Sequence, residues 1–310
     1  MKSFRRFAFF TTLATYFLIF IGGLVRVSGA GLGCPDWPHC FGRWFPPTSI
    51  DQVPPEMLDQ FNMTLAWIEY INRLCGMTVG LFILATALWA IFKYRQHKKI
   101  LYPACGAAML TALQGWQGSV VVKSLLEPVV ITVHMLLALL IVSLLIYTTA
   151  QAYFVERKDS ILYVKVPKSI SKMTGWLWVF SMGQILLGTQ VRMTIEHIMR
   201  DNPDLSGGEW LKQVGMLNHI HMMTGLFLVA FGWFVGFTVL KFKDQLPLFM
   251  RQSALLTILL LTAQLMLGLS FIALDLRPLL QVFHLWVGSM VIGFSMLLYL
   301  TCRENLIKGV

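Results

Sequence analysis

Charged side chains are scarce in this sequence. Asp, Glu, Lys and Arg make up 13% of the 310 residues, whereas hydrophobic residues make up 56% and the mean hydropathy is +0.67. A single soluble core cannot bury that much apolar surface, so an ordinary soluble domain is excluded. Acidic residues are fewer than basic ones, 15 against 25. The composition indicates an integral membrane protein, and an inner-leaflet bias of basic residues explains the charge of +10 without a nucleic-acid partner.

Apolar runs of about 20 residues, the length that crosses a hydrocarbon core, occur eight times along the chain. Because backbone groups in lipid must be hydrogen-bonded within their own segment, each run is predicted to be a helix. The predicted spans are residues 7–27, 66–92, 101–122, 129–154, 174–193, 214–240, 253–273 and 279–300. The predicted fold class is therefore an all-α membrane protein with eight transmembrane helices.

Basic residues are distributed unevenly between the two ends of these spans. With the amino-terminal segment in the cytoplasm, 17 of the 25 Lys and Arg residues lie on the cytoplasmic side, but only 4 of the 15 acidic residues do. The positive-inside rule then places both termini in the cytoplasm. No organelle transit peptide is recognisable, which favours the plasma membrane of a prokaryote.

The sequence also contains an internal repeat. Three pairs of residues recur at an offset of 150: His134 with His284, Gln114 with Gln264, and Gly118 with Gly268. An offset of 149 pairs Asn72 with His221 and Gly76 with Gly225, and an offset of 166 pairs Arg26 with Arg192. The repeat predicts two tandem, pseudo-symmetric four-helix bundles, residues 1–154 and 174–310, joined by a cytoplasmic linker at 155–173.

Histidines are predicted one to two turns into the membrane on its outer side. Two histidines that face each other from different helices commonly hold haem iron through both axial positions. The second bundle offers His221 and His284 for this purpose, while the first offers His134 opposite Asn72. Hydrogen bonding between helices is the alternative role. His219 lies about 200° around the helix from His221, so it is predicted to be a supporting donor.

A second polar group lies in the segment EYINR. Glu69, Asn72 and Arg73 share one edge of a helix at i, i+3 and i+4 spacing, and ionisable groups inside a membrane helix usually mark function. Arg73 lies near the outer end of its helix, as do Arg26 and Arg192. These guanidinium groups either pair with carboxylates such as haem propionates or extend to the lipid headgroups.

Cysteines are few, five in all, and two of them lie close together in the outer loop of residues 28–65. Because this loop is on the oxidising side, Cys34 and Cys40 are predicted to form a disulfide. The disulfide is either a structural crosslink of the loop or a redox pair that exchanges electrons or thiols.

The segments SGAGLGCPDWPHCFG and EYINR, together with His134, His221 and His284, resemble the haem A synthase family over essentially the whole chain. The resemblance implies oxidation of the C8 methyl group of haem O to a formyl group, by successive hydroxylation, for assembly of a terminal oxidase. It implies that the first bundle binds the substrate haem O and that the second holds a haem b cofactor. It also implies roles for Glu69 and Arg73 at the substrate site. The implied partners are a haem O synthase, an electron donor and further copies of the chain.

Asn72 departs from the family pattern, which has a histidine at this position of an E-x-x-H-R motif. A neutral amide is a poor iron ligand beside imidazole, so the first bundle keeps His134 alone. Either the substitution impairs turnover, or this bundle works with one open axial position. Impairment is favoured here, because Glu69 and Arg73 remain. The alternative function is that of a two-haem membrane cytochrome that only transfers electrons.

Overall fold

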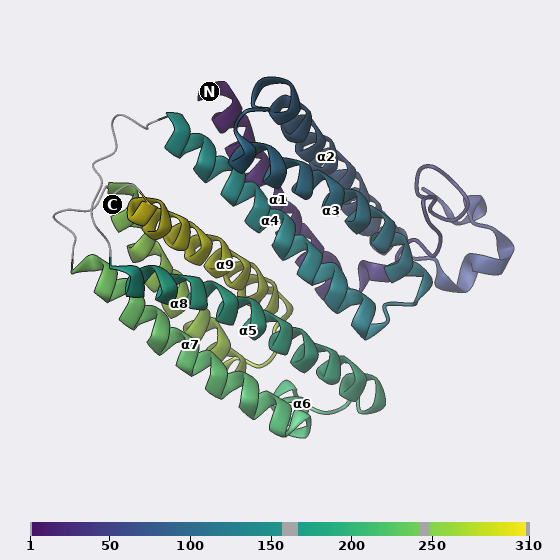
Figure 1. Ribbon diagram of the computed structural model, residues 1–310. Coiled ribbons are helices and arrows are strands. Elements are labelled where there is room, and N and C mark those ends of the chain that lie inside the picture. Colours follow the sequence, from purple (N-terminus) through teal and green to yellow (C-terminus); the bar gives the residue numbers. More distant parts are fainter. Residues whose placement is uncertain (1, 157–166, 242–247, 308–310) are drawn as a thin grey trace. The chain divides into compact units, whose positions relative to one another are not determined.

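The computed structural model describes residues 2–156, 167–241 and 248–307, with side chains described up to residue 303. Within these ranges the chain is helical and contains no β-strand (Figure 1). The helices are α1 (Lys2–Val27), α2 (Met63–Lys93), α3 (Lys98–Lys123), α4 (Pro128–Glu156), α5 (Lys168–Asp201), α6 (Gly207–Val214), α7 (Met216–Leu240), α8 (Leu248–Ala273) and α9 (Pro278–Ile307). Three short 3-10 helices lie in the loop between α1 and α2: Ala30–Leu32, Ile50–Gln52 and Pro55–Gln60.

Local signals in the sequence explain where several helices begin. Pro128 and Pro278 are the first residues of α4 and α9, where a missing backbone N–H costs nothing. Asn62 caps α2, because its side-chain oxygen accepts a hydrogen bond from the Leu65 N–H at 3.1 Å. Pro167 immediately precedes α5.

In the described part of the chain, six helices are long and apolar enough to cross a membrane: α1, α2, α4, α7, α8 and α9. The remaining long helices, α3 and α5, have 26 and 34 residues but a more polar composition, which includes Gln114 and Gln184. Length and composition therefore confirm an all-α, multi-pass membrane protein among the described residues. Membrane crossing by α3 and α5, and the cytoplasmic position of the termini, remain predictions.

The structure differs from the predicted helix boundaries between residues 193 and 214. The helix α5 continues to Asp201, and a separate helix, α6, precedes α7. Ser206 begins α6 with a capping box, in which its hydroxyl accepts from the Glu209 N–H while the Glu209 carboxylate accepts from the Ser206 N–H. Part of the predicted linker, residues 157–166, lies outside the described residues.

The chain divides into two compact units, which we describe separately. The first unit contains residues 7–145, and the second contains residues 1–6 with 146–310, so the division falls within α4. The apolar centre of the first unit includes Ile83, Ile141 and Leu145. The centre of the second includes Leu177 and Leu261.

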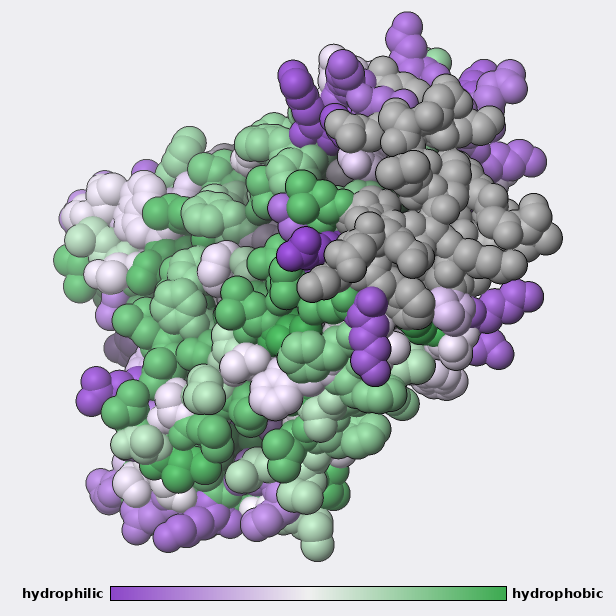
Figure 2. All heavy atoms as spheres, turned by 90° about the vertical axis from the view of Figure 1, so that its left-hand side faces the viewer, coloured by the Kyte–Doolittle hydropathy of each residue, from purple (hydrophilic) through white to green (hydrophobic). Residues whose placement is uncertain are grey.

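Large apolar side chains are exposed along many of the helices. Examples are Phe17 at 60%, Met109 at 70% and Phe234 at 60% exposure. In the face shown in Figure 2, hydrophobic residues cover a broad middle band and hydrophilic residues gather toward its upper and lower margins. Such a band is costly in water and matches a lipid environment.

Candidate functional site

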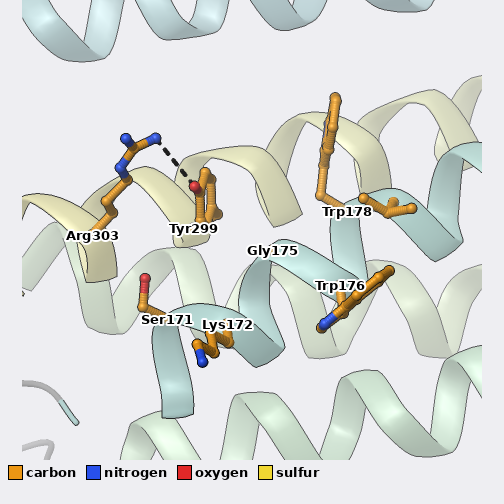
Figure 3. Close-up of a pocket in the computed structure, with 8 residues that line it drawn as sticks. Ser171, Lys172, Gly175, Trp176, Trp178, Tyr299 and Arg303 are labelled. Atoms are coloured by element: carbon orange, nitrogen blue, oxygen red, sulfur yellow. Dashed lines mark hydrogen bonds between the residues drawn. The ribbon is translucent and has the colours of Figure 1, made fainter. Parts of the chain in front are cut away.

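A cavity of about 530 Å³ lies in the second unit, between the amino-terminal part of α5 and the carboxyl-terminal part of α9 (Figure 3). Lys172, Trp176 and Trp178 line it from α5, while Tyr299 and Arg303 line it from α9. The Arg303 guanidinium donates to the Tyr299 hydroxyl at 3.2 Å. Tryptophan and basic side chains together are typical of a water–lipid boundary. His284 lies near the opposite end of α9, so the cavity is separate from the histidine positions.

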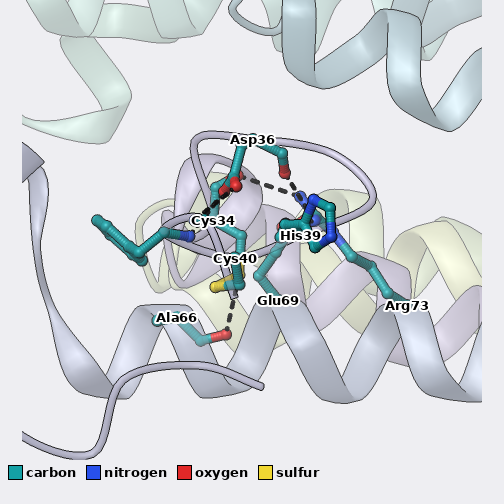
Figure 4. Close-up of a disulfide and its surroundings, with 9 residues drawn as sticks. Cys34, Asp36, His39, Cys40, Ala66, Glu69 and Arg73 are labelled. Atoms are coloured by element: carbon teal, nitrogen blue, oxygen red, sulfur yellow. Dashed lines mark hydrogen bonds and ion pairs between the residues drawn. A yellow bond between two sulfur atoms is a disulfide. The ribbon is translucent and has the colours of Figure 1, made fainter. Parts of the chain in front are cut away.

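The outer loop is held to α2 by one arginine. From α2, the Arg73 guanidinium donates to the backbone carbonyls of Cys34 at 3.1 Å, Asp36 at 2.9 Å and His39 at 2.8 Å (Figure 4). Its Nε donates to Glu69 Oε1 at 3.0 Å, one turn earlier on the same helix. A guanidinium has five N–H donors, and these contacts use four of them. Arg73 is thus an anchor for the loop, which the sequence did not reveal.

The predicted disulfide is confirmed, because Cys34 and Cys40 are bonded in the structure. Both cysteines are buried against α2 in a small apolar cluster with Phe41 and Ala66. Asp36 shapes the turn, since its carboxylate accepts from the backbone N–H of Phe41 at 2.7 Å and of Gly42 at 2.8 Å. The disulfide loop is therefore packed onto the helix that carries EYINR.

Gly33 permits this close packing. A Cβ atom at this position would overlap the Leu65 carbonyl group of α2. Glu69 is only 5% exposed beneath the loop, and its one ion pair in the described part of the chain is with Arg73. A carboxylate this buried requires a charged partner. The sequence placed Glu69 and Arg73 on one edge of a helix, with Arg73 expected to bind a propionate, whereas the structure pairs the two residues directly.

In the first unit, His134 is set against two residues of α3. The Gln114 amide donates to the His134 backbone carbonyl at 3.1 Å. A Cβ atom at Gly118 would lie 3.9 Å from the imidazole Cε1, an ordinary contact distance, so this glycine faces the ring. The Nδ1 atom of His134 is buried without a hydrogen-bond partner in the described structure.

The second unit contains the same arrangement between α8 and α9. A Cβ atom at Gly268 would lie 3.5 Å from His284 Cε1, and Gln264 is located one helical turn before Gly268. His284 Nδ1 is also buried without a partner among the described residues. The Phe271 ring contacts the imidazole edge-on, with ring centroids 5.1 Å apart. The sequence repeat thus corresponds to a repeated local geometry.

A third copy of this arrangement lies between α5 and α7. Gln184 Nε2 lies 2.8 Å from the His221 carbonyl oxygen and 3.1 Å from His221 Nδ1. The Gln184 side-chain oxygen accepts from the Thr224 hydroxyl at 2.7 Å. A Cβ atom at Gly188 would lie 3.0 Å from His221 Cε1. His221 and His284 are close enough to interact electrostatically. The Gln-x-x-x-Gly spacing can be read from the sequence in all three copies.

Other predicted residues have different surroundings. His219 is exposed, and its Nδ1 lies 2.9 Å from the Gly215 carbonyl oxygen of its own helix turn. Arg192 pairs with Glu196 at 2.8 Å and also donates to the side chain of Gln281. Arg26 is half-buried at the end of α1. The partners of Arg192 were not expected from the sequence.

The surroundings of His134, His221 and His284 fit imidazoles that ligate haem iron. Each imidazole lies opposite a glycine, and no protein hydrogen bond from the described residues reaches an Nε2 atom. Nε2 is the nitrogen that commonly ligates a metal. The described residues contain no group of three or more His, Cys, Asp or Glu side chains arranged around one ion. Paired imidazoles on opposite sides of a porphyrin do not require such a group.

These features define a class: a multi-pass helical membrane protein with repeated histidine positions and a disulfide-crosslinked loop. The family model for a cytochrome oxidase assembly protein, COX15-CtaA, matches residues 5–296. The chain therefore belongs to this family.

The chain is similar to bacterial proteins that are named haem A synthase. It is 28% identical to that of Wolbachia sp. subsp. Brugia malayi over 229 residues, which cover 67% of each chain. It is 28% identical to that of Shewanella oneidensis over 184 residues, 57% of this chain and 53% of the relative. It is 24% identical to that of Exiguobacterium sibiricum over 248 residues, 77% and 76% of the two chains. The chain thus spans about half the length of the Shewanella relative that it matches.

Proposed function

We propose that this protein is a haem A synthase, an oxidoreductase that converts the C8 methyl group of haem O to a formyl group by successive hydroxylation. The repeated Gln-x-x-x-Gly and histidine arrangement is the observation that carries the proposal, because it supplies half-buried imidazoles in both units. Family membership and the names of the bacterial relatives support the particular reaction. Iron in a porphyrin supplies the oxidative chemistry, while the protein positions the haem and excludes water from it.

The residues have distinct proposed roles. His221 and His284 hold a haem b cofactor in the second unit, with Gln184 fixing the His221 ring. His134 holds the haem O substrate in the first unit. In this proposal Arg26, near the end of α1, and Arg192, beside Glu196 on α5, pair with haem propionates.

Glu69 and Arg73 complete the substrate site in this proposal. Glu69 holds or orients a proton beside the reacting methyl group, and its pairing with Arg73 keeps the carboxylate in place. Arg73 has one N–H beyond its four hydrogen bonds, which is available to a propionate. Its main contribution is to hold the disulfide loop over this end of the first unit.

The proposal includes a cellular setting, which is supported by the distribution of basic residues and by the resemblance to the family. The protein lies in a prokaryotic plasma membrane with cytoplasmic termini, receives haem O from a haem O synthase, takes electrons from a donor protein and assembles with copies of itself. The disulfide either crosslinks the loop or acts as a redox pair.

The second candidate function is electron transfer by a two-haem cytochrome. One observation favours it: the Glu69 carboxylate is already bound to Arg73, so a structural role accounts for its burial without catalysis.

Haem extraction from the purified protein distinguishes the two functions. Recovery of haem O or haem A together with haem b supports the synthase, and recovery of haem b alone supports the cytochrome. A His284→Ala variant should lose haem b selectively, whereas a His134→Ala variant should lose haem O or haem A. Equal loss of both haems from either variant would contradict separate sites. Comparing the protein with its Asn72→His variant tests impairment, which predicts a higher yield of haem A from the variant.

A further inference from the structure

The four helix pairs of the repeat do not carry the same polar groups. Three pairs present a histidine against a Gln-x-x-x-Gly segment: α3 with α4, α5 with α7, and α8 with α9. The fourth pair, α1 with α2, does not. The offset of 166 places Leu18 where the second unit has Gln184, and the offset of 149 places Asn72 where it has His221.

A third member of this contact network is also replaced. In the second unit, Gln184 binds both His221 and the Thr224 hydroxyl. The residue corresponding to Thr224 is Cys75. The ring, the amide that holds it and the hydroxyl that holds the amide are therefore all absent from the α1–α2 pair. A single damaging substitution at Asn72 does not account for changes at the two other positions.

The space left by these residues remains open in the first unit. A Cβ atom at Gly188 or Gly225 would meet His221 or Gln184 within about 3 Å. At the corresponding glycines, Gly22 and Gly76, a Cβ atom would meet nothing within 4 Å.

Leu18 packs against the apolar cluster that contains Ile83 and Leu145, so this position is apolar where the second unit has the Gln184 amide. An apolar wall with an amide at its edge suits a small, weakly polar molecule better than it suits an ion.

Two side chains near Asn72 on α2, Glu69 and Cys75, are the candidates for the missing ligand. The Glu69 carboxylate is bound by Arg73, one turn toward the outer loop. Cys75 corresponds to Thr224, whose hydroxyl points toward Gln184 rather than toward the space in front of His221. In the first unit, the offset of 166 places Leu18 at the position that corresponds to Gln184.

We infer that the α1–α2 side of the first unit is built as an open coordination face, so that a haem held by His134 binds a small neutral ligand, such as a diatomic gas or water, on the side of Asn72. The inference rests on the haem binding proposed above. It replaces impairment as the explanation of Asn72, since all three members of the His221 network differ together.

Carbon monoxide is a suitable probe, because it binds ferrous haem only where an axial position is free. The purified, haem-loaded full chain is reduced and titrated with carbon monoxide while the Soret band is recorded. We expect about half of the haem to respond, since the second unit has imidazoles for both axial positions. The response should be lost in Asn72→His and retained in Asn72→Ala, which is the matched control.

Exchanging the network between the units provides a second test. The triple variant Gln184→Leu, His221→Asn and Thr224→Cys should gain carbon monoxide binding in the second unit. The reverse triple variant, Leu18→Gln, Asn72→His and Cys75→Thr, should lose it in the first. If the triple variants do not fold, the single Asn72 variants decide the question.

Three results would overturn the inference: no carbon monoxide uptake by the loaded protein, uptake that is unchanged in Asn72→His, or a thiolate-type spectrum that disappears in Cys75→Ser. The extracted haem is measured on the same samples. Haem b alone with half-saturating carbon monoxide uptake would overturn the proposed synthase function and still support the open face.

Discussion

Replacing Arg73 with glutamine is expected to release the disulfide loop from α2. The guanidinium makes three hydrogen bonds to loop carbonyls and is 15% exposed. Hydrogen bonds to charged groups contribute about 1.5–3 kcal/mol each, and the low end applies because the group retains some contact with solvent. Their loss lowers the free energy of loop opening by about 4–5 kcal/mol, which corresponds to roughly a thousandfold increase in the opening equilibrium.

Hydrogen exchange of the Phe41 and Gly42 amides reports this opening, because Phe41 is buried against Ala66 of α2 and both amides are bonded to Asp36, whose backbone carbonyl Arg73 binds. Glu69→Gln should accelerate exchange less than Arg73→Gln does, since it leaves the three loop bonds intact. Arg43→Gln, which removes an exposed arginine from the same loop, is the matched control and should leave exchange unchanged. Wild-type exchange in a folded Arg73→Gln variant would refute the anchoring role.

Two further predictions follow from local geometry. Gly33→Ala should destabilise the contact between the loop and α2 by about 1–3 kcal/mol, because the added methyl group overlaps the Leu65 carbonyl. Thermal unfolding would show this loss. Gly115→Ala is the control, because a Cβ atom there meets nothing within 4 Å and causes no clash. The amino-terminal end of α6 should loosen in acid, because the backbone N–H and hydroxyl of Ser206 lower the pKa of Glu209 from its ordinary value of 4.5. This capping contribution is present above that value and is lost as pH falls through the lowered pKa. Amide exchange of α6 should show the loss, and a Glu209→Gln variant that responds equally to acid would contradict it.

The helices themselves were largely predictable from the sequence. Apolar runs long enough to cross lipid must satisfy their own backbone hydrogen bonds, so composition alone indicates helices. The short helix α6 was not predicted separately, although Ser206 and Glu209 have the spacing of a capping box. It is too short and too polar to give a hydropathy signal.

The candidate site was only partly predictable. The repeat indicated which histidines correspond, because His134 and His284 recur with the same glutamine and glycine on the preceding helix. It did not indicate that Arg73 donates hydrogen bonds to three loop carbonyls. Those contacts join residues that are 34 to 39 positions apart in the sequence, and no helical periodicity relates them. Long-range backbone contacts of this kind leave no pattern in one sequence.

By itself, the sequence determined the membrane setting, the helical class, the internal repeat, the disulfide partners and the histidine positions. Each of these depends on composition or on spacing along the chain. The tertiary structure decided what the polar groups contact: Arg73 anchors the loop, Gln184 joins His221 to Thr224, and Gly22 and Gly76 face open space. The physical reason is that a side chain's partner depends on which helices lie side by side, and that arrangement exists only after the chain has folded.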